Sequence, residues 1–540
     1  MTARKKTAAT RTAQKNHLTQ ISPARKAAYN ILSAVERGQS HSDDLLRSKA
    51  VNALSAPDRN LATALVLGVL RWQIQLDHQI RALLARPNAK LETEVLIALR
   101  LGAFQLLHMD RIPARAVLSE SVELVKHAGH HFASGMVNAV LRKLAVRSQS
   151  VEKEIQGSTI KEIRSSTIKE IRGSTIKEIR GSMIKDIRSS TIKDIRSSTI
   201  KDIRSSTKCQ GTTSVVPQMQ QNERGALAPE KSFSEEMKAH PVWLVERWIN
   251  FYGRDAAQSI CHHGQCQPTL TLRLTAPVVE AELRAAGIAF EPGQLLTAAR
   301  TVVSGDVTTF LEGRVRLQDE GSQLVAEIAS VNSNQKVKSI LDCCAAPGGK
   351  TLILAERNPD ALIVAMESSE PRLEQLRKRL APHAARIECR LADATALTEE
   401  SAFDLALADV PCSGTGTLGR NPEIRHRLRP EDLARHAERQ RAILTAALRA
   451  VRPGGFVVYS TCSLEPEENE QVIAAVLAAT KNARLVSLNA RIEALLGANI
   501  LTHDGAQHLR ASLTPEGALR LLPGAYRTDG FFIALIERTA

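Results

Sequence analysis

The sequence predicts a multidomain protein in which an all-α N-terminal domain precedes an α/β core built on a doubly wound, mostly parallel sheet. Between Ile21 and Arg147 the apolar residues recur at helical spacing, without a strand pattern. From about Val337 onward, short β-rich runs alternate with helical segments, which is typical of a parallel sheet covered by helices. A length of 540 residues is ample for several domains of ordinary size.

The composition excludes several classes of protein. With 43% hydrophobic and 24% charged residues, the chain resembles ordinary globular proteins and is not disordered throughout. Its longest apolar runs, such as Phe456–Tyr459, are far too short to span a bilayer, so we expect no membrane association. Eight cysteines are too few for a disulfide scaffold and favour a reducing compartment, which we take to be the cytoplasm. A net charge of +15 indicates a polyanionic partner, most simply a nucleic acid.

Much of that charge lies in two segments of simple composition. An eight-residue unit of the type STIKEIRS occurs six times between Ser158 and Ser205, with 12 basic and 6 acidic residues in all. Met1–Lys15 adds five basic residues and no acidic ones. Eight residues are about 2.2 helical turns, so the isoleucines of successive units form no continuous apolar stripe. We therefore predict a flexible linker and a disordered basic tail, and the bulk charge is a weak argument for nucleic-acid binding.

The N-terminal region contains five helical segments, with Asp58 as the candidate cap of the second. Several of them, together with Leu99–Met109 and Ile112-Pro113, resemble the NusB-like RNA-binding domain in residue pattern and order. The apolar pattern alone predicts a helical bundle, and the resemblance implies RNA association. The segments are Ser22–Val35, Asp58–Trp72, Leu96–Leu107, Ala116–Val125 and Val137–Leu144.

Six strands are predicted in the C-terminal region. In a doubly wound sheet, ligands bind at the carboxyl ends of the strands, so the polar residues that follow each strand are the candidate site. The predicted strands are Val337–Leu341, Ala361–Ala365, Arg386–Leu391, Phe403–Ala408, Gly455–Tyr459 and Phe531–Ile536.

The first strand leads into a turn of small residues, DCCAAPGGKT, at 342–351. Gly348 and Gly349 allow a ligand to approach backbone N–H groups near a helix N-terminus. The stretch nearly matches a phosphate-binding P-loop, but Cys344 stands where that pattern requires its first glycine. A nucleotide hydrolase is therefore a weaker alternative.

Acidic residues follow the next two strands. Glu367 is placed to accept hydrogen bonds from ribose hydroxyls, as acidic residues do in dinucleotide folds. Asp393 occupies the same position after the third strand and would hold an adenine amino group. A single acid after a strand is often only a cap, but three strand ends in order carry suitable groups.

Cysteines follow the fourth and fifth strands. Cys412 lies in DVPCSG and Cys462 in YSTCS. If these strands are neighbours, about 4.8 Å apart, both thiols face one cleft, which favours thiol chemistry over two incidental cysteines. The segment Cys261–Cys266 has residue types that bind metals, but no second pair at zinc-site spacing accompanies it, so we expect no metal.

Four motifs in the last 200 residues carry a specific resemblance. DCCAAPGGKT, ADVPCSGTGTLGRNPE, STCSLEPEENE and the terminal DGFF resemble, in order and spacing, the RNA cytosine-5 methyltransferase family. With a NusB-like domain in front, the chain is similar to the Fmu/Sun type. The segments His240–Trp248, Pro268–Arg273 and Leu317–Leu324 agree with this resemblance, which implies a small α/β subdomain beside a Rossmann-like methyltransferase core. The expected divisions are a tail at 1–16, a helical domain at 17–148, a linker at 149–230, the subdomain at 231–330 and the core at 331–540.

The resemblance also implies a reaction. S-adenosylmethionine would be the cofactor, and the substrate would be one cytosine of 16S ribosomal RNA, expected at position 967. Cys462 would attack the base as a thiolate, which we expect the site to favour; Cys412 would assist product release and Asp409 would hydrogen-bond the cytosine edge. The cofactor would be held by Cys344, Ala345, Ala346, Pro347, Gly348, Gly349, Lys350, Glu367, Asp393 and Asp409.

Some features depart from the family pattern or leave alternatives. Glu367 stands where many relatives have Asp, and the Asn that commonly follows Arg273, an implied RNA contact, is absent. Four arginines of LGRNPEIRHRLR either hold phosphates that flank the target base or form a solvated helix face. Another RNA, such as transfer RNA, or a non-catalytic RNA-binding role is the alternative function, and we expect a monomer. The four are Arg420, Arg425, Arg427 and Arg429.

Overall fold

The computed structural model describes most of the chain outside its simple-composition segments. The basic tail and the octapeptide repeats lie outside the described residues. The chain forms two compact units, 1–210 with 233–240 and 211–232 with 241–540, each described by itself below. The described residues are 21–38, 41–109, 112–147, 233–311, 313–331 and 336–539.

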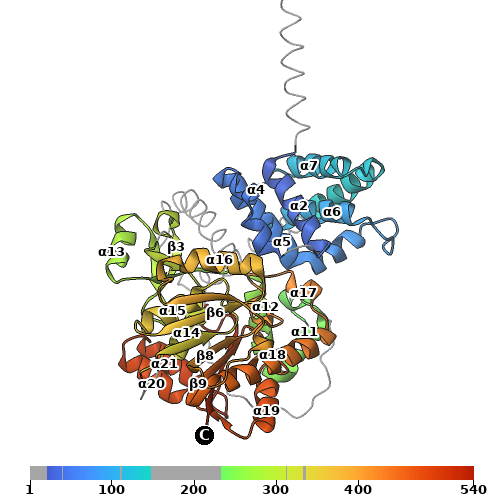
Figure 1. Ribbon diagram of the computed structural model, residues 1–540. Coiled ribbons are helices and arrows are strands. Elements are labelled where there is room, and N and C mark those ends of the chain that lie inside the picture. Colours follow the sequence, from blue (N-terminus) through green and yellow to red (C-terminus); the bar gives the residue numbers. More distant parts are fainter. Residues whose placement is uncertain are drawn as a thin grey trace, which may run out of the picture. The chain divides into compact units, whose positions relative to one another are not determined.

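The described part of the first unit is entirely helical, which confirms the predicted all-α domain (Figure 1). Its core is aliphatic, and the two longest helices cross closely: a Cβ on Gly68 would lie 1.9 Å from the Phe104 ring, so only glycine fits there. A further helical segment covers 134–147. The other helices are α2 (Pro23–Glu36), α3 (Ser42–Leu46), α4 (Lys49–Asn52), α5 (Ala56–Arg81), α6 (Thr93–His108), α7 (Ala114–His127) and α10 (Glu235–Lys238).

Helix α5 begins earlier and ends later than predicted. Its N-cap is Ser55, whose hydroxyl accepts the Asp58 N–H at 3.2 Å and donates to the Asp58 carboxylate at 2.7 Å. The prediction of Asp58 as the cap was wrong by one helical turn. The serine and the acid form a reciprocal pair that the sequence spacing alone did not resolve.

The second unit opens with two helices and a four-stranded antiparallel sheet in the order β2-β3-β1-β4, covered on one face by α13. This is the small α/β subdomain that the resemblance implied. Its elements are α11 (Val242–Tyr252), α12 (Arg254–Gln265), β1 (Leu270–Leu274), α13 (Val278–Ala285), β2 (Ala289–Pro292), β3 (Ala299–Ser304) and β4 (Val315–Leu317).

The core of this unit is a mixed sheet in the order β10-β12-β9-β8-β5-β6-β7, with β11 paired to β12. All six predicted strands are confirmed; β10 and β11 were not predicted. The five strands β5 to β9 run parallel, while β12 is antiparallel to β9. The strands are β5 (Ser339–Asp342), β6 (Leu362–Glu367), β7 (Ile387–Leu391), β8 (Phe403–Asp409), β9 (Val451–Thr461), β10 (Ala483–Val486), β11 (Leu519–Leu521) and β12 (Phe531–Arg538).

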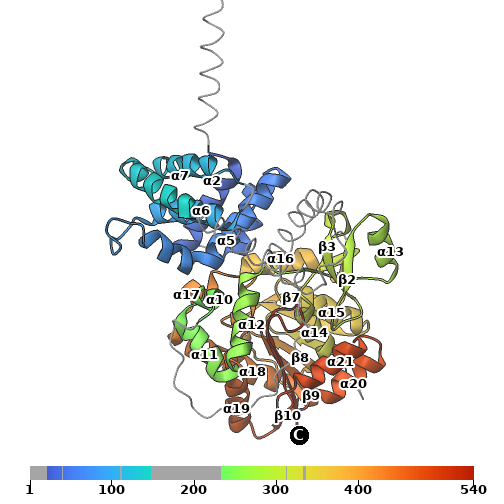
Figure 2. The same ribbon diagram turned by 180° about the vertical axis from the view of Figure 1, so that it is seen from behind.

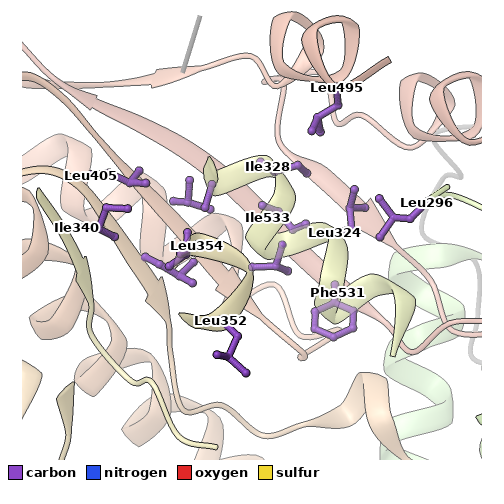
Figure 3. Close-up of a cluster of buried hydrophobic side chains, with 14 of the residues drawn as sticks. Leu296, Leu324, Ile328, Ile340, Leu352, Leu354, Leu405, Leu495, Phe531 and Ile533 are labelled. Carbon is purple, nitrogen blue, oxygen red and sulfur yellow. The ribbon is translucent and has the colours of Figure 1, made fainter. Parts of the chain in front are cut away.

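Helices cover both faces of this sheet (Figures 1 and 2). Alternate strand residues serve the two faces: Leu405 and Leu407 belong to one apolar cluster, shown in part in Figure 3, and Ala406 and Ala408 to the other. No described helix is long and apolar enough to cross a membrane. The first cluster includes α14 (Glu320–Ser330), α15 (Gly349–Arg357), α16 (Glu370–Leu380), α20 (Asn489–Gly497) and α21 (His503–Ala511); the second includes α18 (Pro430–Ala450) and α19 (Glu470–Ala479).

Arg273 joins the small subdomain to the core. Its side chain is 4% exposed and pairs with Glu327 of α14 at 2.8 Å and with Glu356 of α15 at 3.3 Å. The implied RNA contact of this arginine is therefore wrong for this chain. Its guanidinium neutralises the buried Glu327 carboxylate, and a buried cation cannot leave its partners without a large cost in free energy.

The strand order reverses between β5 and β8. From β5 the chain proceeds outward through β6 and β7, then returns to place β8 and β9 on the other side. Such a switch point leaves a crevice at the carboxyl ends of the two central strands, because the connections depart in opposite directions. The candidate site lies there.

Candidate active site

The turn after β5 is shaped for close approach of a ligand. Gly348 adopts φ +95°, and a Cβ there would lie 2.8 Å from Leu376, so both conformation and space require glycine. Gly349 is the first residue of α15, so the turn leads into a helix N-terminus, whose first N–H groups have no partner within the helix. Ala345 N–H is held by the Met366 carbonyl at 2.8 Å, which ties the turn to the neighbouring strand β6.

A pocket of about 430 Å³, counted with its open mouth, lies against this turn. Seven of the predicted cofactor-binding residues line it, all except Gly348, Glu367 and Asp393. Five lining residues were not predicted, including Gln318 and Ser322, which are joined by a 3.2 Å hydrogen bond. The lining consists of Leu317, Gln318, Ser322, Asp342, Cys344, Ala345, Ala346, Pro347, Gly349, Lys350, Arg379 and Asp409.

Asp342 is the buried acid of the pocket. It ends β5, is 1% exposed and accepts a 2.8 Å hydrogen bond from the Thr351 hydroxyl. Burial raises its pKa to about 7, although the Thr351 hydrogen bond opposes the shift. Asp342 was not among the predicted site residues, although it ends the first strand of the core and strand ends were where site residues were expected.

Lys350 and Asp409 form an ion pair across the switch point. The Lys350 ammonium lies 2.8 Å from one Asp409 oxygen, and the Ser460 hydroxyl donates to the other at 2.7 Å. Burial alone would lower the pKa of Lys350, but the charge and hydrogen bond of Asp409 raise it. The ammonium also lies 5.9 Å from the centre of the Phe531 ring. The pair therefore holds one positive and one negative charge side by side at the carboxyl ends of the two central strands.

The acids after β6 and β7 differ in environment. Glu367 is 3% exposed, accepts from the Ser369 N–H at 2.9 Å and pairs with Arg372 at 3.2 Å. Arg372 also donates to the Ala346 carbonyl, so it links Glu367 to the turn. Asp393 is about half exposed and caps a short helical turn through the Thr395 N–H, a hydrogen bond that lowers the pKa of Asp393. Both acids stand at strand ends, one buried and one open to solvent.

The two predicted cysteines meet. Asp409 of β8 pairs with Ser460 of β9 in parallel register, and Cys412 and Cys462 follow within three residues. Their sulfur atoms are 3.3 Å apart, and both side chains are partly exposed. The hydrogen bond with Cys462 and then burial raise the pKa of Cys412 well above its ordinary value. Cys412 is therefore held as the thiol, while either sulfur could be the donor of this contact.

Two of the four candidate phosphate-binding arginines have structural partners instead. Arg420 pairs with Asp319 at 2.9 Å and with Asp529 at 2.6 Å. Arg425 is 1% exposed and donates to the Gly264 carbonyl at 2.9 Å. Both alternatives given for Arg425, a phosphate contact and a solvated helix face, are therefore wrong, because a run of arginines does not reveal which side chains the fold buries. Arg420 is engaged by two carboxylates. In the part of the chain that the structure describes, no cluster of three or more His, Cys, Asp or Glu could hold a metal ion.

Comparison with known families accounts for most of the chain. Residues 329–537 match the family described as 16S rRNA methyltransferase RsmB/F. Residues 22–146 match the NusB family, and residues 240–304 match the ferredoxin-like domain of RsmF/B-like methyltransferases. The order of the three matches follows the order of the helical domain, the small subdomain and the core.

Individual relatives match over nearly their whole length. A probable ribosomal RNA small subunit methyltransferase B of Synechocystis sp. is 30% identical over 531 residues, covering 95% of this chain and 99% of the relative. One of Bacillus subtilis, with the same name, is 29% identical over 531 residues, covering 95% and 98%. Among solved structures, the crystal structure of PH0851 superposes with a TM-score of 0.64 at 20% identity, covering 96% of this chain and 99% of that one; it shows a shared fold.

The switch-point pocket, the sheet and these matches together define the class: an S-adenosylmethionine-dependent RNA methyltransferase. The resemblance noted in the sequence is thereby confirmed at the level of the family. The chain belongs to the RsmB/F family of ribosomal RNA small subunit methyltransferases.

Proposed function

We propose that this methyltransferase transfers a methyl group to carbon 5 of one cytosine of 16S ribosomal RNA, at position 967, through a covalent bond between Cys462 and the base. The observation that carries the proposal is the 3.3 Å approach of the Cys412 and Cys462 sulfur atoms beside the switch-point pocket. A methyltransferase acting on an oxygen or an exocyclic nitrogen needs no such thiol pair. Carbon 5 of cytosine is a poor nucleophile and needs covalent activation.

The thiols have separate tasks. The Cys462 thiolate adds to carbon 6 of the ring, and the electron pair displaced from the 5,6 double bond makes carbon 5 nucleophilic. After carbon 5 has gained the methyl group, a base removes its proton, the double bond re-forms and the carbon–sulfur bond breaks. Cys412, held as the thiol, donates a hydrogen bond to the departing Cys462 sulfur and so assists release.

Asp409 and Lys350 would control charge at the target ring. With one oxygen fixed by Ser460 and the other by Lys350, the carboxylate of Asp409 is held rigidly at the end of β8. It is placed to accept a hydrogen bond from the amino group of the cytosine edge, which orients the ring for attack. The target base must be unstacked to enter the crevice.

The pocket fits the cofactor. When bound, S-adenosylmethionine supplies an electrophilic methyl group. Gly349 lines the pocket at the N-terminus of α15, and the buried Oε1 of Gln318 has no hydrogen-bond partner within the described chain. Glu367 would accept hydrogen bonds from the ribose hydroxyls and Asp393 from the adenine amino group. The residues from Cys344 to Lys350 would enclose the remainder.

Two cysteine variants test the proposal. Cys462→Ala should abolish transfer of labelled methyl groups to unmodified small-subunit RNA. Cys412→Ala should instead accumulate a protein–RNA adduct, visible on a denaturing gel, because departure of the Cys462 sulfur is no longer assisted. Cys389→Ala on β7 is the matched control and should behave as wild type. An adduct in Cys462→Ala would reverse the two assignments, and activity in both variants would refute the thiol mechanism.

Position mapping and cofactor binding address the alternatives. Bisulfite mapping of treated ribosomal and transfer RNAs should find one new 5-methylcytosine, at position 967 of 16S RNA; methylation of transfer RNA alone would favour the other substrate. Failure to bind S-adenosylmethionine in calorimetry would favour a non-catalytic RNA-binding role. We also propose that the protein acts as a monomer in the cytoplasm, which sedimentation and fractionation would test.

A further inference from the structure

A fully buried carboxylate lies behind the cysteine pair. Glu468, in the segment between β9 and α19, is 0% exposed. One of its oxygens accepts from the Ser413 backbone N–H at 2.8 Å and from the Gln440 amide at 3.0 Å. The other accepts from the hydroxyls of Ser413 and Ser463. An ionised carboxylate accepts at about four positions and donates at none, so these four donors use its full capacity.

The donors connect this carboxylate to both cysteines. Ser413 directly follows Cys412, and Ser463 directly follows Cys462, 50 residues further along the chain. The two serine hydroxyls are themselves 3.0 Å apart. One side chain therefore holds together the two loops that carry the thiols.

Helix α18 also contributes to holding the two cysteine loops, through Gln440. Gln440 of α18 donates to Glu468 and, at 2.9 Å, to the carbonyl of Pro411, the residue before Cys412. Glu468 also contributes through its own backbone carbonyl, which accepts from the Tyr459 hydroxyl of β9 at 2.6 Å. Glu468 does not line the cofactor pocket, so its contacts serve the thiol side of the crevice.

We propose that Glu468 is a positioning residue that clamps the Cys412 and Cys462 loops, so that the two sulfur atoms meet at hydrogen-bonding distance. The inference rests on the proposed roles of the two cysteines. The charge of Glu468 acts in the same direction: after the Cys462 hydrogen bond, burial and the charge of Cys462, it contributes to the raised pKa of Cys412. By holding the two loops together and by favouring the protonated form of Cys412, Glu468 would keep Cys412 able to donate a hydrogen bond while Cys462 reacts.

Glu468→Gln is the informative variant, because it keeps the size of the side chain and replaces an acceptor with an amide donor that faces other donors. We expect kcat to fall about 10- to 100-fold, the usual effect of losing a partner that orients a reacting group. The KM for RNA and the affinity for S-adenosylmethionine should stay within about threefold of wild type, since the pocket is untouched.

A second readout separates positioning from a merely structural role. The pH profile of iodoacetamide alkylation at Cys412, followed by mass spectrometry on the full-length protein, should move to lower pH in Glu468→Gln. This measurement needs neither RNA nor methyl transfer. A wild-type protein that makes no 5-methylcytosine would overturn the proposed function, whereas an unmoved alkylation profile would overturn the role of Glu468.

Two further variants serve as a control for loss of a nearby acid and as a substitute if Glu468→Gln does not fold. Glu467→Gln changes the neighbouring acid, which pairs with Arg247 at 2.6 Å instead of contacting the cysteine loops, and should match wild type in kcat and alkylation. Ser413→Ala removes a single hydroxyl donor and should give a smaller change in the same direction. If Glu468→Gln does not fold, Ser413→Ala decides: a shifted alkylation profile in a folded protein supports the clamp. An unchanged profile overturns it.

Discussion

At the scale of single residues, Asp342 shows how position determines chemistry. Burial at the end of β5 raises its pKa to about 7, so the folded protein retains a proton there that the unfolded chain has already lost. The folded state therefore binds more protons between about pH 4 and pH 7, and this group makes folding less favourable as the pH rises through that window, by up to about 4 kcal/mol.

Asp342→Asn should remove this dependence. Relative to wild type, the variant should gain about 2–3 kcal/mol in free energy of unfolding between about pH 5 and about pH 8, because asparagine does not titrate. Urea unfolding in a Trp72→Phe background measures it, since the remaining Trp243 and Trp248 report on the second unit. Glu374→Gln, at an exposed site, should show no such gain. Parallel stability curves for Asp342→Asn and wild type would contradict the buried, protonated state.

Glu367 gives a residue-scale prediction for the cofactor. Its carboxylate, buried and fixed by Ser369 and Arg372, still has free acceptor positions for two ribose hydroxyls. Glu367→Gln should weaken S-adenosylmethionine binding at least about tenfold in calorimetry, since a hydrogen bond to a charged group contributes about 1.5–3 kcal/mol. Glu370→Gln, an exposed acid three residues on, is the control. Equal affinities in both variants would remove Glu367 from the cofactor site.

Site residues at strand ends could be predicted from the sequence, because their distance from a predicted strand can be read directly from it. Cys412 and Cys462 meet because each follows its strand within three residues and the two strands are neighbours. Burial by segments remote in sequence was not predictable. Gln318 reaches the pocket from the segment Leu317–Leu324, which was expected in the small subdomain, and Arg425 is buried against a segment 161 residues away.

At the scale of elements, strands inside the sheet were easier to predict than short strands at its edge. Five of the six predicted strands lie inside the sheet, and the sixth, β7, is an edge strand of five residues. The two that were missed have four and three residues and pair only with β12 at the edge of the sheet, so their short patterns do not differ from those of loops. The order of strands, which creates the switch point, is a property of tertiary pairing that no local pattern contains.

Gly416, which follows β8, packs against the loop that carries Cys462 after β9. Its substitution tests how closely these two segments must pack. Its N–H donates to the Cys462 carbonyl at 2.9 Å, and a Cβ would lie 2.8 Å from that oxygen and 2.6 Å from the Gly530 carbonyl. Gly416→Ala should therefore displace the Cys462 loop, reduce the free energy of unfolding by about 1–3 kcal/mol and lower kcat.

Affinity for S-adenosylmethionine should change little in Gly416→Ala, because Gly416 does not line the pocket. Gly497→Ala in α20, where no atom would contact the new Cβ, is the control for added volume. Calorimetry, urea unfolding and single-turnover methylation measure the three quantities. A kcat equal to that of wild type would show that the loop tolerates the shift.

At the scale of the whole molecule, the family is identified by the order of the domains and not by the net charge. The family matches follow the helical domain, the small subdomain and the core, none of which depends on the net charge of +15. The octapeptide repeats at 158–205 account for +6 of that total, although they match none of the three families. The domain boundaries expected from the sequence stay predictions.

Deletion of 158–205 separates these contributions. Basic residues bind RNA through release of counterions, so the loss of six net charges should weaken RNA binding about 3- to 30-fold at low salt and hardly at all at high salt. The value of kcat should stay unchanged, because every residue assigned to the site lies beyond 316 and none lies in the repeats. Filter binding across a salt series and single-turnover methylation measure the two effects.

A replacement of equal length distinguishes charge from spacing. With 48 Gly and Ser residues in place of the repeats, the length is restored without the charge. If the charge is what matters, this variant should bind RNA as weakly as the deletion and with the same reduced salt slope. If the neutral replacement instead restores wild-type affinity, the repeats act as a spacer, and their basic residues contribute nothing to RNA binding.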